Sequence, residues 1–376
     1  MRNGNSIRVF LYFFLFSCIF FSCSSEKDSI LVDSWEEEED GVQVGFHIAF
    51  EEIPDTRAPE GDYDNGMGSD FENYIDFANT NFRILFFDVD NKYLSALQPE
   101  RIALVGNAGV RSKYYDVVGR INKPLSSDFK VVMLANWREY PQELKVGETT
   151  IGDICSSINS QYPYISPFIL SLDNLIPMYG VKYCENKKFY SNMCTYLGTI
   201  HMLRAMAKVE VNCVDTSGWT LEHVTLHRYN SKGYCAPDNI VDESGYVKGN
   251  YDDDYVDKLH LPAGKNDADD KELAFERMSD SRFVIYVPEY QNVVDGKKAI
   301  DASEIKIKFK QSEKVHTIDF KYYDAPSSKV EVGTPFDIRR NYYYKFNVTR
   351  THVDVVDVCV KVVPYTEIIL EPDFGL

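Results

Sequence analysis

The sequence predicts a mostly-β protein with two β-sandwich domains of the transthyretin-like or Greek-key type, short helices, and one leading and one trailing strand. Its 376 residues exceed what one compact core usually absorbs, which favours two domains. Its 26 tyrosines and 23 phenylalanines are side chains that strands favour. Segments in which apolar and polar residues alternate also recur along the chain, and this period of two is typical of half-buried strands.

The N-terminus has the organisation of an export signal. Arg2 and Arg8 precede the apolar run VFLYFFLFSCIFF, residues 9–21. A membrane-spanning helix needs ~20 apolar residues, so this shorter run indicates a signal-peptide core. Cys23 follows the small residue Ser22 and precedes a polar segment, which is the order of a bacterial lipoprotein cleavage site. We therefore expect residues 1–22 to be the signal peptide and Cys23 to carry lipid. An ordinary secretory signal with an incidental cysteine is the alternative.

The leading strand lies between two polar segments. Residues 24–41 are polar and acidic, and include EEEED at 36–40, which is typical of a solvated tether. The strand follows as VQVGFHIAF, with five apolar residues on one face: Val42, Val44, Phe46, Ile48 and Phe50. Residues 54–67, PDTRAPEGDYDNGM, then have the composition of an exposed loop that a protease can cut, with Arg57 in it. A permanent edge strand followed by an ordinary surface arginine is the alternative.

The first domain is expected over residues 58–200. FRILFFDVDNKYLSAL, from Phe82, predicts a strand, an Asp-Asn turn and a second strand. The segment 127–137, SDFKVVMLANW, predicts another strand, and residues 151–179 have a mixed pattern that suits short helices joined by loops.

The second domain is expected over residues 201–376, opening at HMLRAMAKVEVNCV, residues 201–214. Further strands are predicted in WTLEHVTLHRYN, SRFVIYVPEY, EIKIKFK, KVHTIDFKYY and RNYYYKFNVTR, with an acidic loop at 250–272. In the trailing strand, four valines alternate with Asp357, Cys359 and Lys361; the valines are Val356, Val358, Val360 and Val362. Pro364 interrupts this pattern, and residues 365–370 can begin one more short strand.

No residue pattern predicts catalysis, and we expect no enzyme activity and no cofactor. The motifs GxSxG, HExxH, GxGxxG and the Walker loop do not occur. His223 and His227 share one face of a predicted strand without a third ligand nearby, so solvent-facing residues are the better interpretation. Asp88 and Asp90 begin like a calcium loop, but Lys92 and Tyr93 stand where an acidic ligand and a glycine belong.

The remaining charges and cysteines predict no metal or nucleic-acid site. The acidic run 252–254 suits a solvated loop, and the formal net charge of −18 opposes binding to phosphates. Six cysteines follow Cys23: Cys155, Cys184, Cys194, Cys213, Cys235 and Cys359. They include no CxxC pair, so a zinc site is not predicted, and both disulfides and buried thiols remain open.

These segments together resemble one family. The lipoprotein signal, the alternating first strand, an arginine in a loop, FRILFFDVDNKYL, LRAMAKVEV, FVIYVPEY, NYYYKFNV and a terminal PDFG are similar, in this order, to the fimbrillins of Bacteroidales, the subunits of protease-assembled type V pili. The resemblance implies a lipidated precursor in the outer membrane that an arginine-specific protease cuts between Arg57 and Ala58. The propeptide 23–57 then leaves with its strand, and the subunit joins a cell-surface fimbrium that serves adhesion.

The resemblance also implies the partners. Other copies of the chain or related fimbrial subunits would exchange strands with it, and no nucleic acid would bind. The donor strand would be residues 353–370, with these apolar residues: Val356, Val358, Val360, Val362, Ile368 and Leu370. The alternatives are an anchor subunit, an adhesive tip subunit, or a surface lipoprotein that binds glycans without polymerising. Exposed tryptophans would favour the last, and the chain has three: Trp35, Trp137 and Trp219.

Overall fold

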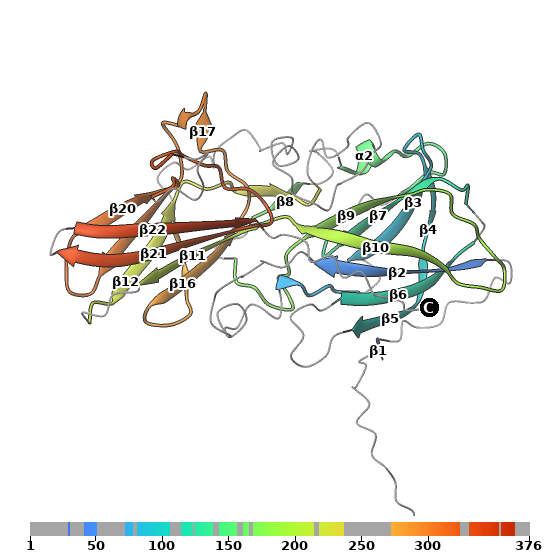
Figure 1. Cartoon of the computed structure of the whole chain (residues 1–376), viewed down its shortest axis with the longest axis horizontal. Coiled ribbons are helices and arrows are strands. Elements are labelled where there is room, and N and C mark those ends of the chain that lie inside the picture. The colour runs from blue at the N-terminus through green and yellow to red at the C-terminus, as the bar shows by residue number, and fades with distance from the viewer. Residues whose placement is uncertain are drawn as a thin grey trace, which may run out of the picture.

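The computed structural model describes residues 29–30, 41–50, 72–77, 81–105, 114–122, 125–137, 143–155, 161–164, 168–213, 218–236, 272–323, 331–352 and 355–364. The mostly-β prediction is confirmed, because strands dominate these residues (Figure 1). Several predicted features lie outside the described residues, namely Cys23, Trp35, Arg57, Ala58, the run 252–254, Ile368 and Leu370. No helix in the described part of the chain is long and apolar enough to cross a membrane.

The N-terminal half contains one continuous hydrogen-bonded order of nine described strands, β1-β5-β6-β2-β10-β9-β7-β3-β4. Their bounds are β1 Ser29–Ile30, β2 Val42–Phe50, β3 Phe82–Phe87, β4 Tyr93–Ala96, β5 Gln98–Val105, β6 Tyr114–Ile121, β7 Phe129–Ala135, β9 Met178–Cys184 and β10 Thr195–Arg204. β10 pairs with β2 up to Met202 and with β9 at Leu203 and Arg204, so it joins two parts of the sheet. Phe77 packs against Phe82 of β3 and Tyr115 of β6, which belong to these two parts.

The C-terminal half consists of two sheets that face one another, with the described strand orders β15-β16-β11-β21-β22 and β14-β12-β19-β20. Their bounds are β11 Ala207–Cys213, β12 Leu221–His227, β14 Glu272–Ala274, β15 Glu276–Arg277, β16 Arg282–Val287, β19 Glu304–Phe309, β20 Val315–Asp319, β21 Tyr342–His352 and β22 Val355–Pro364. The rings of Phe320, just after β20, and Phe346 of β21 lie 5.4 Å apart between the sheets. This packing makes the half a β-sandwich.

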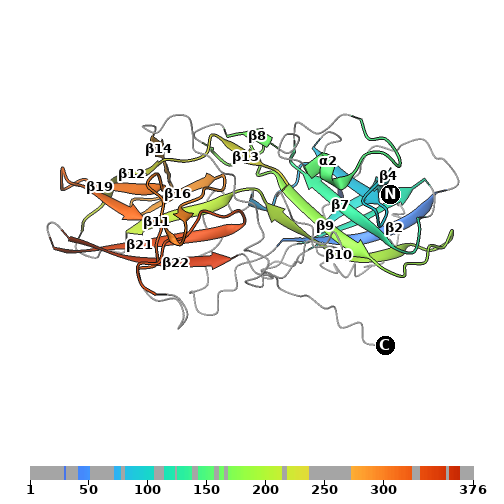
Figure 2. The same cartoon turned by 90° about the horizontal axis from the view of Figure 1, so that it is seen from above.

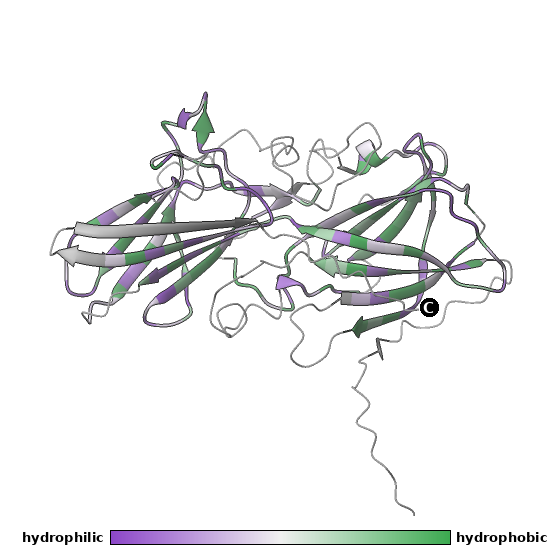
Figure 3. Ribbon diagram, in the orientation of Figure 1, coloured by the Kyte–Doolittle hydropathy of each residue, from purple (hydrophilic) through white to green (hydrophobic). Residues whose placement is uncertain are grey.

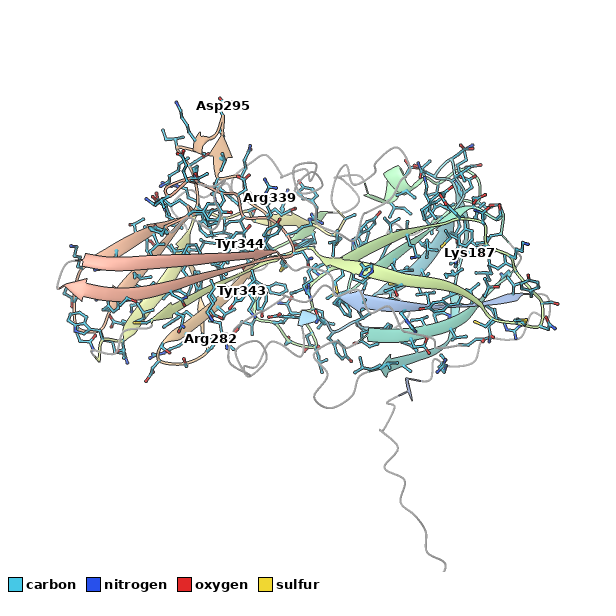
Figure 4. All side chains as sticks on the ribbon, in the orientation of Figure 1. Lys187, Arg282, Asp295, Arg339, Tyr343 and Tyr344 are labelled. Atoms are coloured by element: carbon cyan, nitrogen blue, oxygen red, sulfur yellow. The ribbon has the colours of Figure 1, made fainter. Side chains whose placement is uncertain are left out.

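A short hairpin projects from the C-terminal half (Figure 1). It is formed by β17, Val293–Val294, and β18, Lys297–Lys298. Asp295 and Gly296 connect them with φ of 51° and 71°, and two consecutive positive φ angles are typical of a type I′ turn. Figure 4 labels Asp295 at the tip and Lys187 in the other half of the molecule.

The two halves lie side by side along the long axis of the molecule, as Figures 1 and 2 show. A small ladder lies between them, in which β8, Gln161–Pro163, pairs with β13, Lys232–Tyr234. The segment predicted as one opener, residues 201–214, is divided in the structure: β10 ends at Arg204 in one sheet and β11 begins at Ala207 in another. The apolar pattern continues across this break because both strands are buried, so it gives no local sign of the change of sheet.

Local predictions from sequence are confirmed in several places. β3 and β4 are joined by the expected turn, where Asn91 has a φ of 65° and the Asp88 carboxylate accepts from the Lys92 amide at 2.8 Å. The helix α2, Ile151–Cys155, lies in the segment expected to hold short helices. In Figure 3 hydrophobic residues lie along the strands of both halves, as the alternating patterns require.

Candidate functional site

The leading strand β2 lies inside the N-terminal sheet. It pairs antiparallel with β6, from Val42 opposite Ile121 to Ala49 opposite Tyr114. On its other side it pairs parallel with β10, from Val44 opposite Thr195 to Phe50 opposite Met202. The alternative of an edge strand is therefore wrong. Removing β2 would leave two unpaired strand edges, because it would separate β1-β5-β6 from the other five described strands.

All five apolar side chains predicted for the inner face of β2 are buried. Val44, Phe46 and Ile48 have no exposed surface, and Val42 and Phe50 are 4% and 7% exposed. The Phe50 ring packs edge-on against Tyr115 of β6. Tyr115 is itself 7% exposed, and this burial raises its pKa to about 12.

The outer face of β2 carries polar contacts to both neighbouring strands. His47 Nε2 lies 3.5 Å from the Asp116 carboxylate of β6, and its Nδ1 lies 2.7 Å from the Tyr196 hydroxyl of β10. Asp116 also forms an ion pair with Arg101 at 2.8 Å. Partial burial lowers the pKa of His47 below its usual value, although the nearby Asp116 acts in the opposite direction.

Near the start of β2, its outer face lies against charged side chains and a cysteine. Gln43 donates to Glu100 at 2.7 Å, and Glu100 is in turn bound by Arg120 of β6. A Cβ atom placed on Gly45 would lie 3.1 Å from the sulfur of Cys194, which immediately precedes β10. Cys194 is exposed, and its pKa is raised by partial burial of the thiol and by the nearby carboxylates of Asp116 and Glu100.

Arg204, the last residue of β10, connects the end of β2 to two other segments. Its guanidinium carbon lies 5.9 Å from the centre of the Phe50 ring. Its Nε donates to the Asn73 side chain at 3.0 Å, and its Nη1 donates to the Asn341 side chain at 2.8 Å. The end of β2 and the next described stretch of the chain, which begins at residue 72, therefore lie beside the same arginine.

The residue at this re-entry point is anchored by a buried ion pair. Lys208 of β11 donates to the Glu72 carboxylate at 2.6 Å, and both side chains are about one-tenth exposed. The Tyr286 hydroxyl of β16 donates to the same carboxylate oxygen. The stretch that begins at residue 72 is therefore fixed to the C-terminal half through β11 and β16.

The predicted donor strand β22 lies at the edge of the five-stranded sheet, where β21 is its partner among the described strands. The two pair antiparallel from Tyr342 opposite Pro364 to His352 opposite Val355. This register brings three of the predicted donor valines opposite buried residues of β21: Val358 opposite Val348, Val360 opposite Phe346, and Val362 opposite Tyr344.

Other sequence candidates are not brought together. His223 and His227 lie on β12 with Thr225 between them. His223 is exposed as predicted, whereas His227 is half-buried and its Nδ1 atom is buried. No cluster of three or more potential metal ligands occurs among the described residues.

Trp137 is buried, and Trp219 packs edge-on against Phe309, so neither offers an exposed platform for a glycan. Among the cysteines with described side chains, Cys184 is a buried free thiol and Cys194 an exposed one, and Cys213 and Cys235 are buried.

Comparison with known proteins identifies the fold. No protein-family model and no curated protein sequence matches the chain. Among solved structures, the tip fimbrial protein Mfa3 from Porphyromonas gingivalis with C-terminal truncation matches with a TM-score of 0.53 and 12% identity, over 86% of this chain and 99% of that chain. The chain has the fold of a Bacteroidales fimbrial protein. The resemblance to fimbrillins is thereby confirmed at the level of the fold.

Two further fimbrial structures match over similar lengths. A fimbrial assembly protein from Parabacteroides distasonis has a TM-score of 0.43 and 11% identity, covering 85% of this chain and 96% of that chain. A fimbrilin, FimA, from Porphyromonas gingivalis has a TM-score of 0.45 and 10% identity, covering 86% and 98%.

Sequence reasoning missed two parts of this site within the fimbrial fold. β6 has the sequence YYDVVGRI, in which Gly119 and the adjacent Val117 and Val118 obscure the alternation. The contacts of Arg204 and Glu72 carry no local signal, because each depends on partners more than 100 residues away.

Proposed function

We propose that this chain is a structural pilin, a fimbrillin that is exported as a lipoprotein on Cys23, cut after Arg57 and polymerised by strand exchange into surface fimbriae that serve adhesion. The observation that carries the proposal is the internal position of β2, a strand that is followed in the sequence by the segment containing Arg57. A strand in this position cannot be lost without creating a site that another strand fits.

The burial of β2 supports a strong demand for a replacement. Full burial of an apolar side chain contributes ~1.5–3 kcal/mol, so the five on the inner face together contribute roughly 8–15 kcal/mol as an upper bound. A whole domain has a net stability of ~5–15 kcal/mol. The N-terminal half without β2 is therefore expected to be stable only after it captures another strand.

The position of β22 supports its role as the replacement. An edge strand with one described partner can leave its sheet without dividing it, and none of the described strands pairs with its other edge. When β22 of one subunit fills the β2 site of the next, the contact is head-to-tail and repeats without closing. Such a contact produces an open filament.

The anchoring of residue 72 supports a clean separation after the cut. Glu72 and Asn73 bind Lys208 and Arg204, so the chain that follows the cleaved loop stays attached to the body of the subunit. The upstream piece is held by β2, through its pairing with β6 and β10, and by the two-residue strand β1, which pairs with β5. Cleavage therefore leaves β2 as a separate peptide that a second copy of the chain can displace.

The test is a comparison of Arg57→Ala and Arg57→Lys with the unchanged chain in cells that assemble the fimbriae. We expect both variants to accumulate as lipidated, unpolymerised precursor, because an arginine-specific protease does not accept the lysine even though its charge is kept. The unchanged chain should give a ladder of multimers on gels run without heating. Arg277→Ala, at an exposed arginine in the other half, serves as the matched control and should polymerise normally.

Three results would contradict the proposal. Polymers of normal length from Arg57→Ala would show that no cut at this arginine is needed. Surface protein that is monomeric and still begins at lipidated Cys23 would favour an anchor subunit. Tight binding of a polysaccharide by that stable monomer would favour the glycan-binding lipoprotein.

A further inference from the structure

We propose that adjacent subunits are joined by a disulfide between Cys194 beside the β2 site and Cys359 of the incoming β22. This inference rests on the proposed function, because it requires β22 of a second copy to occupy the place of β2. It is carried by three independent features of the site: the distance from Gly45 to Cys194, the apolar register and the charges on the outer face.

The distance at Gly45 fits a disulfide. In a disulfide the S–S bond is about 2.04 Å, which puts each Cβ about 3.0 Å from the partner's sulfur. A Cβ built on Gly45 lies 3.1 Å from the sulfur of Cys194. A side chain at position 45 that is not bonded to Cys194 would be crowded by its sulfur, and β2 itself has glycine at this position. A strand that carries cysteine at this position can instead form a bond.

The alternation of β22 places its cysteine at that position. If Cys359 takes the place of Gly45, then Val356 and Val358 take those of Val42 and Val44. Val360 and Val362 then take the places of Phe46 and Ile48, so all four valines of the predicted donor strand enter buried sites. Pro364 falls at the last residue of β2, which lies beyond the last pairing with β6 but opposite Met202 of β10, so the proline ends the ladder at this position.

The charges select one direction for the incoming strand. In the register above, Asp357 takes the place of Gln43, whose partner on β6 is Arg120, and Lys361 takes the place of His47, whose partner is Asp116. Both pairs across β6 are attractive, but Glu100, to which Gln43 donates at 2.7 Å, would also face the Asp357 carboxylate. A reversed strand could also place Cys359 at Gly45, but it would set Asp357 opposite Asp116 and Lys361 opposite Arg120. On the pairing across β6 alone, the incoming strand is expected to run in the direction of β2, parallel to β10.

The size of the donor side chains explains the use of a covalent bond. Val360 and Val362 are smaller than Phe46 and Ile48, so they bury less apolar surface in the same sites. A disulfide keeps the strand in place whatever the strength of that packing. It forms by thiol–disulfide exchange: two thiols lose two protons and two electrons to a disulfide oxidant, whose S–S bond breaks to give two thiols. Cys194 is exposed and accessible to such an oxidant.

The first experiment uses polymers of the full-length chain assembled in cells, treated with glutathione disulfide, alkylated and heated in detergent without reductant. We expect a ladder of linked subunits that dithiothreitol collapses to monomer, and a cross-linked peptide that contains Cys194 and Cys359. Cys194→Ser and Cys359→Ser should each abolish this heat-resistant ladder, while electron microscopy still shows filaments. Cys213→Ser, at a buried thiol, is the matched control and should leave the ladder unchanged.

The outcomes separate this inference from the proposed function. Filaments from the unchanged chain without a reductant-sensitive ladder, or a ladder that persists in Cys194→Ser, would overturn the disulfide and leave the polymerisation intact. If the unchanged chain forms no filaments at all, both fail.

A second measurement needs no polymer. Gly45→Cys in the uncleaved precursor is expected to bond to Cys194 within one chain, with loss of two titratable thiols relative to the reduced protein. Gly45→Ser is its control and should keep all thiols. If the introduced cysteine stays free under oxidising conditions, the geometric basis of the inference is wrong.

Discussion

The leading strand β2 and the trailing strand β22 are similar in sequence but differ in position. Both alternate apolar residues with polar ones, and both lie near an end of the chain. β2 has a neighbour on each side, whereas β22 has one neighbour among the described strands. Removal of β2 divides its sheet, and removal of β22 only shortens its sheet. The comparison teaches that a strand's position, more than its sequence, determines whether its removal divides the sheet.

The largest expected difference comes from deleting each strand. A chain that begins at Ala58 should not persist as a folded monomer, because it loses roughly 8–15 kcal/mol of apolar burial. A precursor that ends at His352 should remain a folded monomer that unfolds cooperatively and does not polymerise after cleavage. Size-exclusion chromatography and thermal unfolding of both chains provide the measurement. Two equally stable monomers would remove the distinction between the strands.

Single substitutions should show the same difference on a smaller scale. Phe46→Ala in the precursor is expected to lower the free energy of unfolding by ~3–5 kcal/mol, because this fully buried ring leaves a cavity. Val360→Ala, on an edge strand, should lower it by less than about 2 kcal/mol. Denaturant titration monitored by tryptophan fluorescence compares the two. Equal losses would indicate that β22 is held as firmly as β2.

The smallest expected effect is the pH dependence of precursor stability that arises from His47 of β2. The pKa of His47 is lowered in the folded chain, so its contribution to stability is present above the unfolded value of about 6.5 and is lost as the pH falls through the folded value. His47→Gln should therefore reduce the loss of precursor stability on going from neutral to mildly acid pH. Thermal unfolding at a series of pH values measures it. An unchanged or steeper dependence would contradict this role of His47.

The sequence predicted individual strands better than their neighbours. The alternation of residues 42–50 and the DVDN turn depend on local spacing, and both appear in the structure. The pairing of β2 with β10 joins residues about 150 positions apart and depends on the packing of the whole half, so no local pattern encodes it. Likewise, no local pattern in the sequence places Cys194 beside Gly45, and their closeness is visible only in the structure.

The most direct test of strand replacement is the mass and N-terminal sequence of the subunit recovered from sheared filaments. We expect a chain that begins at Ala58 and lacks residues 23–57, with no β2 peptide retained in the purified filament. A filament subunit that still contains residues 42–50, either in the intact chain or as a bound peptide, would contradict the replacement of β2 by a strand from another subunit.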